Sequence, residues 1–267
     1  MEDTNTVITN SDEDKASSNT VTIEAKDKDD KVEVTLKDVN IDTSSRSEAA
    51  VSVTGEGNTN IELDGDNALK SDIYSSGISS SGSLTISGGE NDSLTAQGGS
   101  GADGIYSSGS LTISGGTVTA NGGSGGGGDG GDGIWSSGGV TISGGSTVTA
   151  NGGDGKDDYG GDGIDSGDVT ISGGSTVTAN GGNGGNVSGD GIRSDSGDVT
   201  ISGGTVKAAG GDSKDRLRRR RHPQRRRHHL RRYGQRRWRQ RRQSRRLRHL
   251  QLRPCRHLRR YGQRRWR

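Results

Sequence analysis

Residues 1–215 of this 267-residue chain contain no cysteine, histidine, proline or phenylalanine. This region therefore cannot form a disulfide scaffold, a histidine-ligated metal site or a histidine-based catalytic triad. It also has few large apolar side chains, whereas a conventional globular core needs roughly half of its residues to be apolar. Two possibilities are left for this region: a disordered chain, or a repeat architecture that buries small residues in register.

Charge is unevenly distributed along the chain. Residues 1–215 hold all 34 acidic residues and 11 basic ones, while residues 216–267 hold 25 arginines and no acidic residue. No run of about 18 apolar residues occurs, so we expect no membrane span. Met1 is followed by Glu2 and Asp3 instead of a secretion signal, and we expect that the natural N-terminus is missing from this sequence.

A repeat of 27 to 30 residues runs through the middle of the chain. Each unit reads D-G-I-x-S, then (L/V)-T-I-S-G-G, then (S)-T-V-T-A-N-G-G, then a variable loop of glycine and aspartate. The second of these motifs begins at Leu84, Leu111, Val140, Val169 and Val199. Internal repetition at such a period is typical of solenoids.

Alternation within each unit predicts short β-strands. Leu111 and Ile113 share one face, and Val118 and Ala120 share another, with threonines pointing the opposite way. Ile105 supplies the apolar residue of the first short run. Three strands separated by glycine turns describe one coil of a right-handed parallel β-helix, in which stacked coils lie about 4.8 Å apart. Disorder is the alternative, but an unstructured glycine and serine linker would not keep this alternation in phase.

The repeat also divides the chain into segments. Residues 1–19 are polar and we expect them to be disordered, whereas residues 73–211 form the regular repeats. Residues 20–72 are interpreted as irregular opening coils, with strands expected at Thr20–Ala25, Val32–Ile41, Ala50–Thr54 and Asn60–Leu63. A recurring asparagine at one turn predicts a ladder of stacked amides formed by Asn121, Asn151 and Asn180.

Residues 212–267 are interpreted as the same repeat read in a shifted frame. The stretch HLRRYGQRRWR occurs at His229–Arg239 and at His257–Arg267, which are 28 residues apart, as coils of the repeat are. Back-translated and read one nucleotide later, Gln224–Leu230 can encode S-G-G-V-T-I-S, the string at Ser137–Ser143. We therefore expect a disordered basic tail and an uncapped last coil, and no role for Cys255. The alternative is a nucleic-acid-binding arm in which aromatic residues interleave with the arginines.

The motifs resemble those of a bacterial, Firmicutes-type family of carbohydrate-binding parallel β-helices and of glycine-rich surface adhesins. The resemblance rests on VTLKDVNI at 34–41, IELDGDNAL at 61–69 and the repeated DGI…LTISGGTVTANGG, and it extends over about residues 20–211. It implies secretion or surface attachment, calcium binding and, in some members, affinity for acidic plant polysaccharide.

An aspartate at the same position of successive repeats is the candidate metal site. Asp103, Asp132, Asp162 and Asp190 would stack a few ångströms apart, and such carboxylates repel one another unless a hard cation bridges them. We therefore expect Ca²⁺ as a cofactor, with solvated loop acids that bind ions weakly as the alternative. Matches to the calcium nonapeptide of β-rolls occur only once per unit, which disfavours that fold.

Aromatic residues of the D-G-I-x-S motif are the candidate ligand site. Tyr106 and Trp135 follow the motif's isoleucine, and Tyr74 lies in a related I-Y-S-S-G stretch. One outward column of these three rings could stack on sugars, or could simply shield the sheet surface. A column of paired threonines also suits ice-binding β-helices, but threonine is an ordinary residue on strand surfaces.

These observations favour a non-enzymatic, secreted or cell-surface protein that binds polysaccharide, with calcium assisting. We expect a monomer that binds no specific nucleic acid. The alternative is a passive stalk or adhesin spacer with no ligand of its own. A polysaccharide lyase is the third possibility, and it is disfavoured because such enzymes on this fold need a basic residue beside calcium, whereas no base recurs in the repeats.

Overall fold

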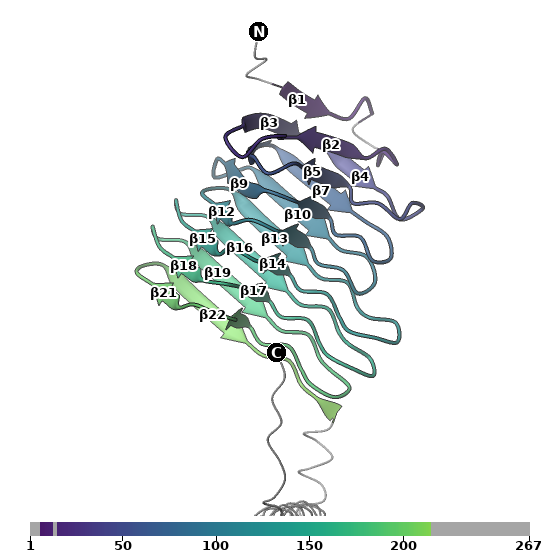
Figure 1. Cartoon of the computed structure of the whole chain (residues 1–267), viewed down its shortest axis with the longest axis vertical. Helices are drawn as coiled ribbons and strands as arrows, with labels where there is room; N and C mark the ends of the chain where they lie inside the picture. Colours follow the sequence, from purple (N-terminus) through teal and green to yellow (C-terminus); the bar gives the residue numbers. More distant parts are fainter. Residues whose placement is uncertain (1–5, 13–14, 215–267) are drawn as a thin grey trace, which may run out of the picture. The chain divides into compact units, whose positions relative to one another are not determined.

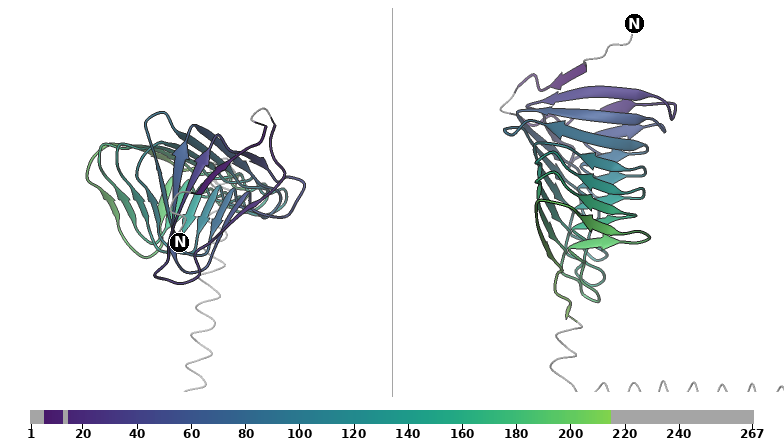
Figure 2. Two further views of the ribbon diagram at one scale, coloured as in Figure 1. Left: turned by 90° about the horizontal axis from the view of Figure 1, so that it is seen from above. Right: turned by 90° about the vertical axis from the view of Figure 1, so that its left-hand side faces the viewer.

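The computed structural model describes residues 6–12 and 15–214 as a stack of coils built from parallel β-strands (Figure 1). The strands form three sheets, A, B and C, and each complete coil contributes one strand to each sheet in the order C, A, B. Strands of successive coils lie above one another along the stack (Figure 2). The predicted parallel β-helix is confirmed. In the described part of the chain, no helix is long and apolar enough to cross a membrane.

The three sheets have the following strands, each in spatial order. Sheet A contains β1 (Thr6–Thr9), β3 (Lys31–Lys37), β6 (Asn58–Asp64), β9 (Ser83–Gly88), β12 (Leu111–Ile113), β15 (Val140–Ile142), β18 (Val169–Ile171) and β21 (Val199–Ile201). Sheet B contains β4 (Asn40–Asp42), β7 (Asp66–Lys70), β10 (Ser93–Gln97), β13 (Thr117–Asn121), β16 (Thr147–Asn151), β19 (Thr176–Asn180) and β22 (Thr205–Ala209). Sheet C contains β2 (Val21–Glu24), β5 (Val51–Thr54), β8 (Ile78–Ser80), β11 (Ile105–Ser107), β14 (Ile134–Ser136), β17 (Ile164–Ser166) and β20 (Ile192–Ser194).

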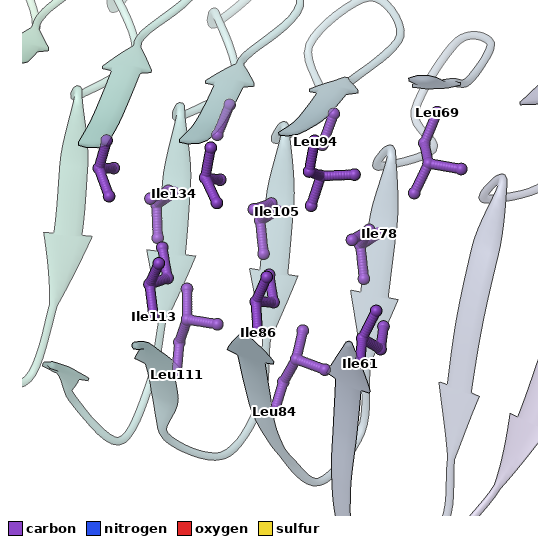
Figure 3. Packing of buried hydrophobic residues seen from close by; sticks show 14 of the residues in the cluster. Ile61, Leu69, Ile78, Leu84, Ile86, Leu94, Ile105, Leu111, Ile113 and Ile134 are labelled. Atoms are coloured by element: carbon purple, nitrogen blue, oxygen red, sulfur yellow. The ribbon is translucent and has the colours of Figure 1, made fainter. Parts of the chain in front are cut away.

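The core is a narrow column of aliphatic side chains enclosed by the three sheets (Figure 3). In the coil of β11, β12 and β13, the side chains of Ile105, Leu111, Ile113, Val118 and Ala120 are fully buried. The same positions are buried in the next two coils, so like residues stack on like. The predicted alternation is thereby confirmed, and it explains how a chain with few large apolar residues can bury a continuous core.

Close contact between coils explains the abundance of glycine in the loops that connect sheet B to sheet C. A Cβ atom added to Gly153 would lie 2.2 Å from the carbonyl oxygen of Gly123 in the preceding coil. A Cβ atom on Gly182 would likewise lie 2.0 Å from the carbonyl oxygen of Gly153. Only glycine lets the backbones of successive coils approach this closely.

The opening coils follow the expected order but turn one corner where none was predicted. The stretch expected as one strand at Val32–Ile41 is divided into β3 and β4, which belong to sheets A and B. Asp38 adopts a φ of 49° at the corner between them. Aspartate tolerates this left-handed conformation better than most residues, so it can replace glycine at the turn.

The segment expected to lack structure at residues 1–19 contains strand β1. Thr6–Thr9 pairs in parallel with Val34–Lys37 of β3, so β1 extends sheet A by one strand. Ile8 packs against the edge of the core, and the β-branched residues of this strand suit an extended backbone. The described residues therefore begin with a strand that covers the first coil.

The last described coil exposes the apolar residues of its sheet A strand. Val199 and Ile201 of β21 are 46% and 53% exposed, whereas the equivalent Val169 and Ile171 of the preceding coil are buried. Within the described residues no further strand pairs with β21, as expected for an uncapped coil. Residues 215–267, which include Cys255 and the whole arginine-rich segment at 216–267, lie outside the described residues.

Candidate functional site

The outward positions of sheet C form one column that crosses every coil. Strand pairing aligns Thr22 with Ser52, Ser52 with Ser79, and Ser79 with Tyr106. The column continues through Trp135 to Asp165 and Arg193. It therefore starts with three small hydroxyl side chains, has two aromatic rings in its middle, and ends with an acid and a base.

Tyr106 and Trp135 stack face to face on neighbouring strands. Their ring centroids lie 4.7 Å apart and the ring planes differ by 7°. The separation matches the distance between adjacent strands, so in-register pairing by itself brings the rings into contact. The hydroxyl of Ser108 also lies 3.3 Å from the phenol oxygen of Tyr106, which helps to fix the orientation of that ring.

Tyr74 does not lie in this column, contrary to the sequence-based expectation. Strand β8 begins at Ile78, so Ile78 and not Ile73 aligns with Ile105, and Ser79 takes the position opposite Tyr106. Tyr74 instead occupies a turn, with a φ of 61° and a side chain that is 84% exposed. The I-Y-S-S-G stretch at 73–77 thus resembles the repeat in letters but precedes the strand.

Tyr74 nevertheless borders the same groove as Tyr106. The groove has a volume of about 550 Å³ and lies over the first part of the column. Most of its lining is polar and hydroxyl-bearing: Thr20, Thr22, Ser47, Glu48, Ala49, Ser52, Tyr74, Ser75, Ser76, Ser79 and Tyr106. The sequence did not point to the contribution of residues 47–49, because the loop before β5 belongs to an irregular coil and carries no repeated motif.

The four predicted metal-binding aspartates are brought together, as a ladder that we call the aspartate ladder: Asp103, Asp132, Asp162 and Asp190. The backbone N–H of Asp132 donates to Oδ1 of Asp103 at 2.7 Å. The N–H groups of Asp162 and Asp190 donate in the same way to the preceding aspartate, each at 2.5 Å. Each carboxylate of the first three rungs therefore accepts a hydrogen bond from the backbone of the next coil.

Burial and mutual repulsion raise the pKa values of these carboxyls. Burial is the main cause for Asp103, whose pKa rises to about 6. The pKa of Asp132 rises to about 8, first because of burial and then because of the charge on Asp103. Burial also raises the pKa of Asp162. Desolvation penalises the charged form, so the carboxyls of Asp103, Asp132 and Asp162 have higher pKa values than an exposed aspartate.

Asp165 and Arg193 extend the charged cluster beside the ladder. Arg193 approaches Asp162 at 3.4 Å, Asp165 at 3.8 Å and Asp195 at 2.7 Å. Asp165 is buried, its pKa is raised by burial to about 6, and its Oδ1 has no hydrogen-bond partner among the described residues. Asp165 and Arg193 follow the isoleucine of the D-G-I-x-S motif, as Tyr106 and Trp135 do, but the sequence gives no indication that they cluster with Asp162.

The aspartate ladder does not fit the calcium ion that the sequence suggested. Ca²⁺ is bound by six to eight oxygen atoms gathered around one point. Among residues 6–12 and 15–214, no group of three or more histidine, cysteine, aspartate or glutamate side chains is arranged to hold a metal ion. One oxygen of each of the first three rungs is already engaged by a backbone N–H. The sequence showed the spacing of these acids but not which of their oxygens the backbone occupies.

Comparison with known proteins agrees with the coil repeat. The family described as a beta helix repeat matches residues 111–134, 140–168 and 199–213. No curated protein and no solved structure matches the chain. Each matched segment begins at a sheet A strand, β12, β15 or β21, so the repeat of the family corresponds to the coil of the structure. These three segments are therefore similar to the repeats of that family, and the similarity agrees with the parallel β-helix seen in the structure.

Proposed function

We propose that this protein is a non-enzymatic polysaccharide-binding β-helix that acts as a monomer in the secreted or cell-surface environment. The observation that carries the proposal is the groove of sheet C, which is lined by hydroxyl side chains and by Tyr106, the ring that stacks on Trp135. Aromatic rings offer a surface for the C–H faces of sugar rings, and serine and threonine hydroxyls can hydrogen-bond sugar hydroxyls.

The lining of the groove supports binding in preference to catalysis. Cleavage of a glycosidic bond by general acid and base requires two positioned ionisable groups, commonly two carboxyls. Of the described residues that line the groove, Glu48 is the one carboxylate, and Tyr74 and Tyr106 are the other ionisable side chains. Appearance of unsaturated or reducing-end product on incubation with polysaccharide would contradict this part of the proposal.

Calcium is not part of the proposed mechanism, because the aspartate ladder does not fit the ion. The groove lies over the first coils, whereas the acid-rich end of the column lies beyond Trp135. We therefore expect glycan binding to be the same with a chelator as with added calcium.

A passive spacer is the second candidate function, and the regularity of the stack favours it. Equivalent residues of β13, β16 and β19 pair in full register, so successive coils repeat with little variation. Such a stack can project another domain without binding a ligand of its own.

Glycan-array screening followed by calorimetry separates the two functions. The wild-type chain should bind at least one polysaccharide, and Tyr106→Ala should weaken that binding by about tenfold or more, since an aromatic contact contributes up to about 1.5 kcal/mol beyond area burial. Thr112→Ala, on the outer face of sheet A, is the matched control and should bind as wild type does. Absence of binding to every glycan would favour the spacer.

A further inference from the structure

We propose that the groove holds one neutral sugar ring that stands edge-on to sheet C, stacked on the free face of Tyr106 and above Ser79. This inference rests on the polysaccharide-binding function proposed above. It adds how the sugar ring lies and which class of sugar fits.

The free face of Tyr106 follows from the order of strands in sheet C. Strand β11 lies between β14 and β8, so Trp135 covers one face of the phenol ring and Ser79 is the neighbour on the other side. A serine side chain is too short to cover the face of an aromatic ring. The groove, which both Ser79 and Tyr106 line, occupies the space that remains.

The aromatic pair also sets the orientation of an added ring. Tyr106 and Trp135 are parallel to within 7° and repeat at 4.7 Å, so they stand as successive rungs along the column. A third ring in the same orientation would take the rung above Ser79. A pyranose ring is a suitable occupant, because its C–H face can stack on Tyr106 while its hydroxyls, at the ring edge, reach polar side chains.

Hydroxyl groups surround this rung. Ser52 and Thr22 continue the column beyond Ser79, and Ser75 and Ser76 come from the turn before β8. Such donors and acceptors can hydrogen-bond the hydroxyls of a sugar, and a few polar groups around an apolar contact are typical of small-ligand sites.

Charge selects neutral sugars over uronates. Among the described residues, Glu48 is the charged side chain that lines the groove, and no lysine or arginine of residues 6–12 or 15–214 lines it. Within residues 1–215, which include the groove, acidic residues outnumber basic ones by 34 to 11. A carboxylate-bearing sugar would be repelled, and the acidic plant polysaccharide implied by the family resemblance is therefore a poor match for this groove.

The proposal is tested by filling the proposed sugar position with an aromatic side chain. Ser79→Trp should extend the aromatic stack by one ring and occupy the proposed position of the sugar, and Ser79→Tyr provides a second variant. Thr112→Trp adds an aromatic ring to the outer face of sheet A and is the control. Binding is measured by calorimetry with cellohexaose, mannohexaose and hexagalacturonate, and thermal unfolding confirms that each variant is folded.

We expect at least one neutral hexasaccharide to bind the wild-type chain, with hexagalacturonate binding at least about tenfold more weakly. Both Ser79 variants should lose binding of the neutral sugar, Thr112→Trp should keep it, and Glu48→Gln should strengthen hexagalacturonate binding. Neutral-sugar binding that is lost in Tyr106→Ala but kept in the folded Ser79 variants would overturn the stacked position and leave the proposed function intact. Preference for hexagalacturonate would overturn the charge argument, and absence of all glycan binding would reject both proposals.

Discussion

Two ladders of polar side chains flank the glycine loops of the solenoid, and they differ by one chemical group. In the asparagine ladder, formed by Asn121, Asn151 and Asn180, Nδ2 of Asn151 donates to Oδ1 of Asn121 and Nδ2 of Asn180 donates to Oδ1 of Asn151, both at 2.8 Å. In the aspartate ladder the side chains stack at the same coil spacing, but the donor comes from the backbone.

The difference shows what a repeating polar ladder requires. An amide is both donor and acceptor, so identical amides satisfy one another without net charge. A carboxylate only accepts, so each aspartate needs an outside donor for one oxygen, and neighbouring charges repel. In the aspartate ladder, a backbone N–H supplies the donor at each of the first three rungs. The cost of bringing these carboxyls together appears as raised pKa values for Asp103, Asp132 and Asp162.

Gly153→Ala should break both ladders and have the largest effect. Its Cβ would lie 2.2 Å from the Gly123 carbonyl oxygen, so the two coils would have to separate at the loop between the ladders. We expect a loss of about 3 kcal/mol or more in the free energy of unfolding, measured by denaturant titration. Gly127→Ala is the control, since a Cβ there has no heavy atom within 4 Å and the residue has no positive φ. Equal stability of the two variants would contradict the close-packing argument.

Asn151→Asp should convert one rung of the asparagine ladder into a carboxylate. The Asn151 amide that donates to Oδ1 of Asn121 at 2.8 Å would be replaced by a second acceptor. We expect a loss of about 2 kcal/mol near neutral pH, the cost of leaving a partly buried group unpaired, with partial recovery in acid, where the new carboxyl is protonated. Asn91→Asp, at an exposed turn, adds the same charge without a ladder and should change stability little. A destabilisation that does not depend on pH would show that charge is not the cause.

Asp132→Asn should convert one rung of the aspartate ladder into an amide and remove a pH dependence. The pKa of Asp132 is about 8 in the folded chain and 3.8 ordinarily, so the folded state retains a proton that the unfolded state releases between these values. The contribution of this group to stability is complete below pH 3.8 and is lost as the pH rises to about 8. Thermal unfolding from pH 4 to 8 should therefore be less pH-dependent in the variant, with the greatest stabilisation at the alkaline end. Asp129→Asn, in the exposed loop, is the control, and a wild-type stability that rises over this range would refute the prediction.

The repeat itself could be predicted from the sequence because each position meets its own counterpart one coil away. The inward Leu111 and Ile113 and the asparagine ladder are local consequences of alternation and period. Tyr74 was misplaced because Ile73 of the I-Y-S-S-G stretch lies five residues before Ile78, the isoleucine at which β8 begins. The groove and the hydrogen bonds of the aspartate ladder depend on how neighbouring coils approach, and a motif within one coil does not contain that information.

The stack of Tyr106 on Trp135 has an optical consequence. Two aromatic rings held parallel at 4.7 Å couple their electronic transitions, and the coupling exists only while β11 and β14 stay in register. The near-ultraviolet circular dichroism of the chain should therefore contain a signal that reports on this single junction between coils. That signal should disappear when either ring is replaced. It therefore measures whether β11 and β14 remain paired at the edge of the groove.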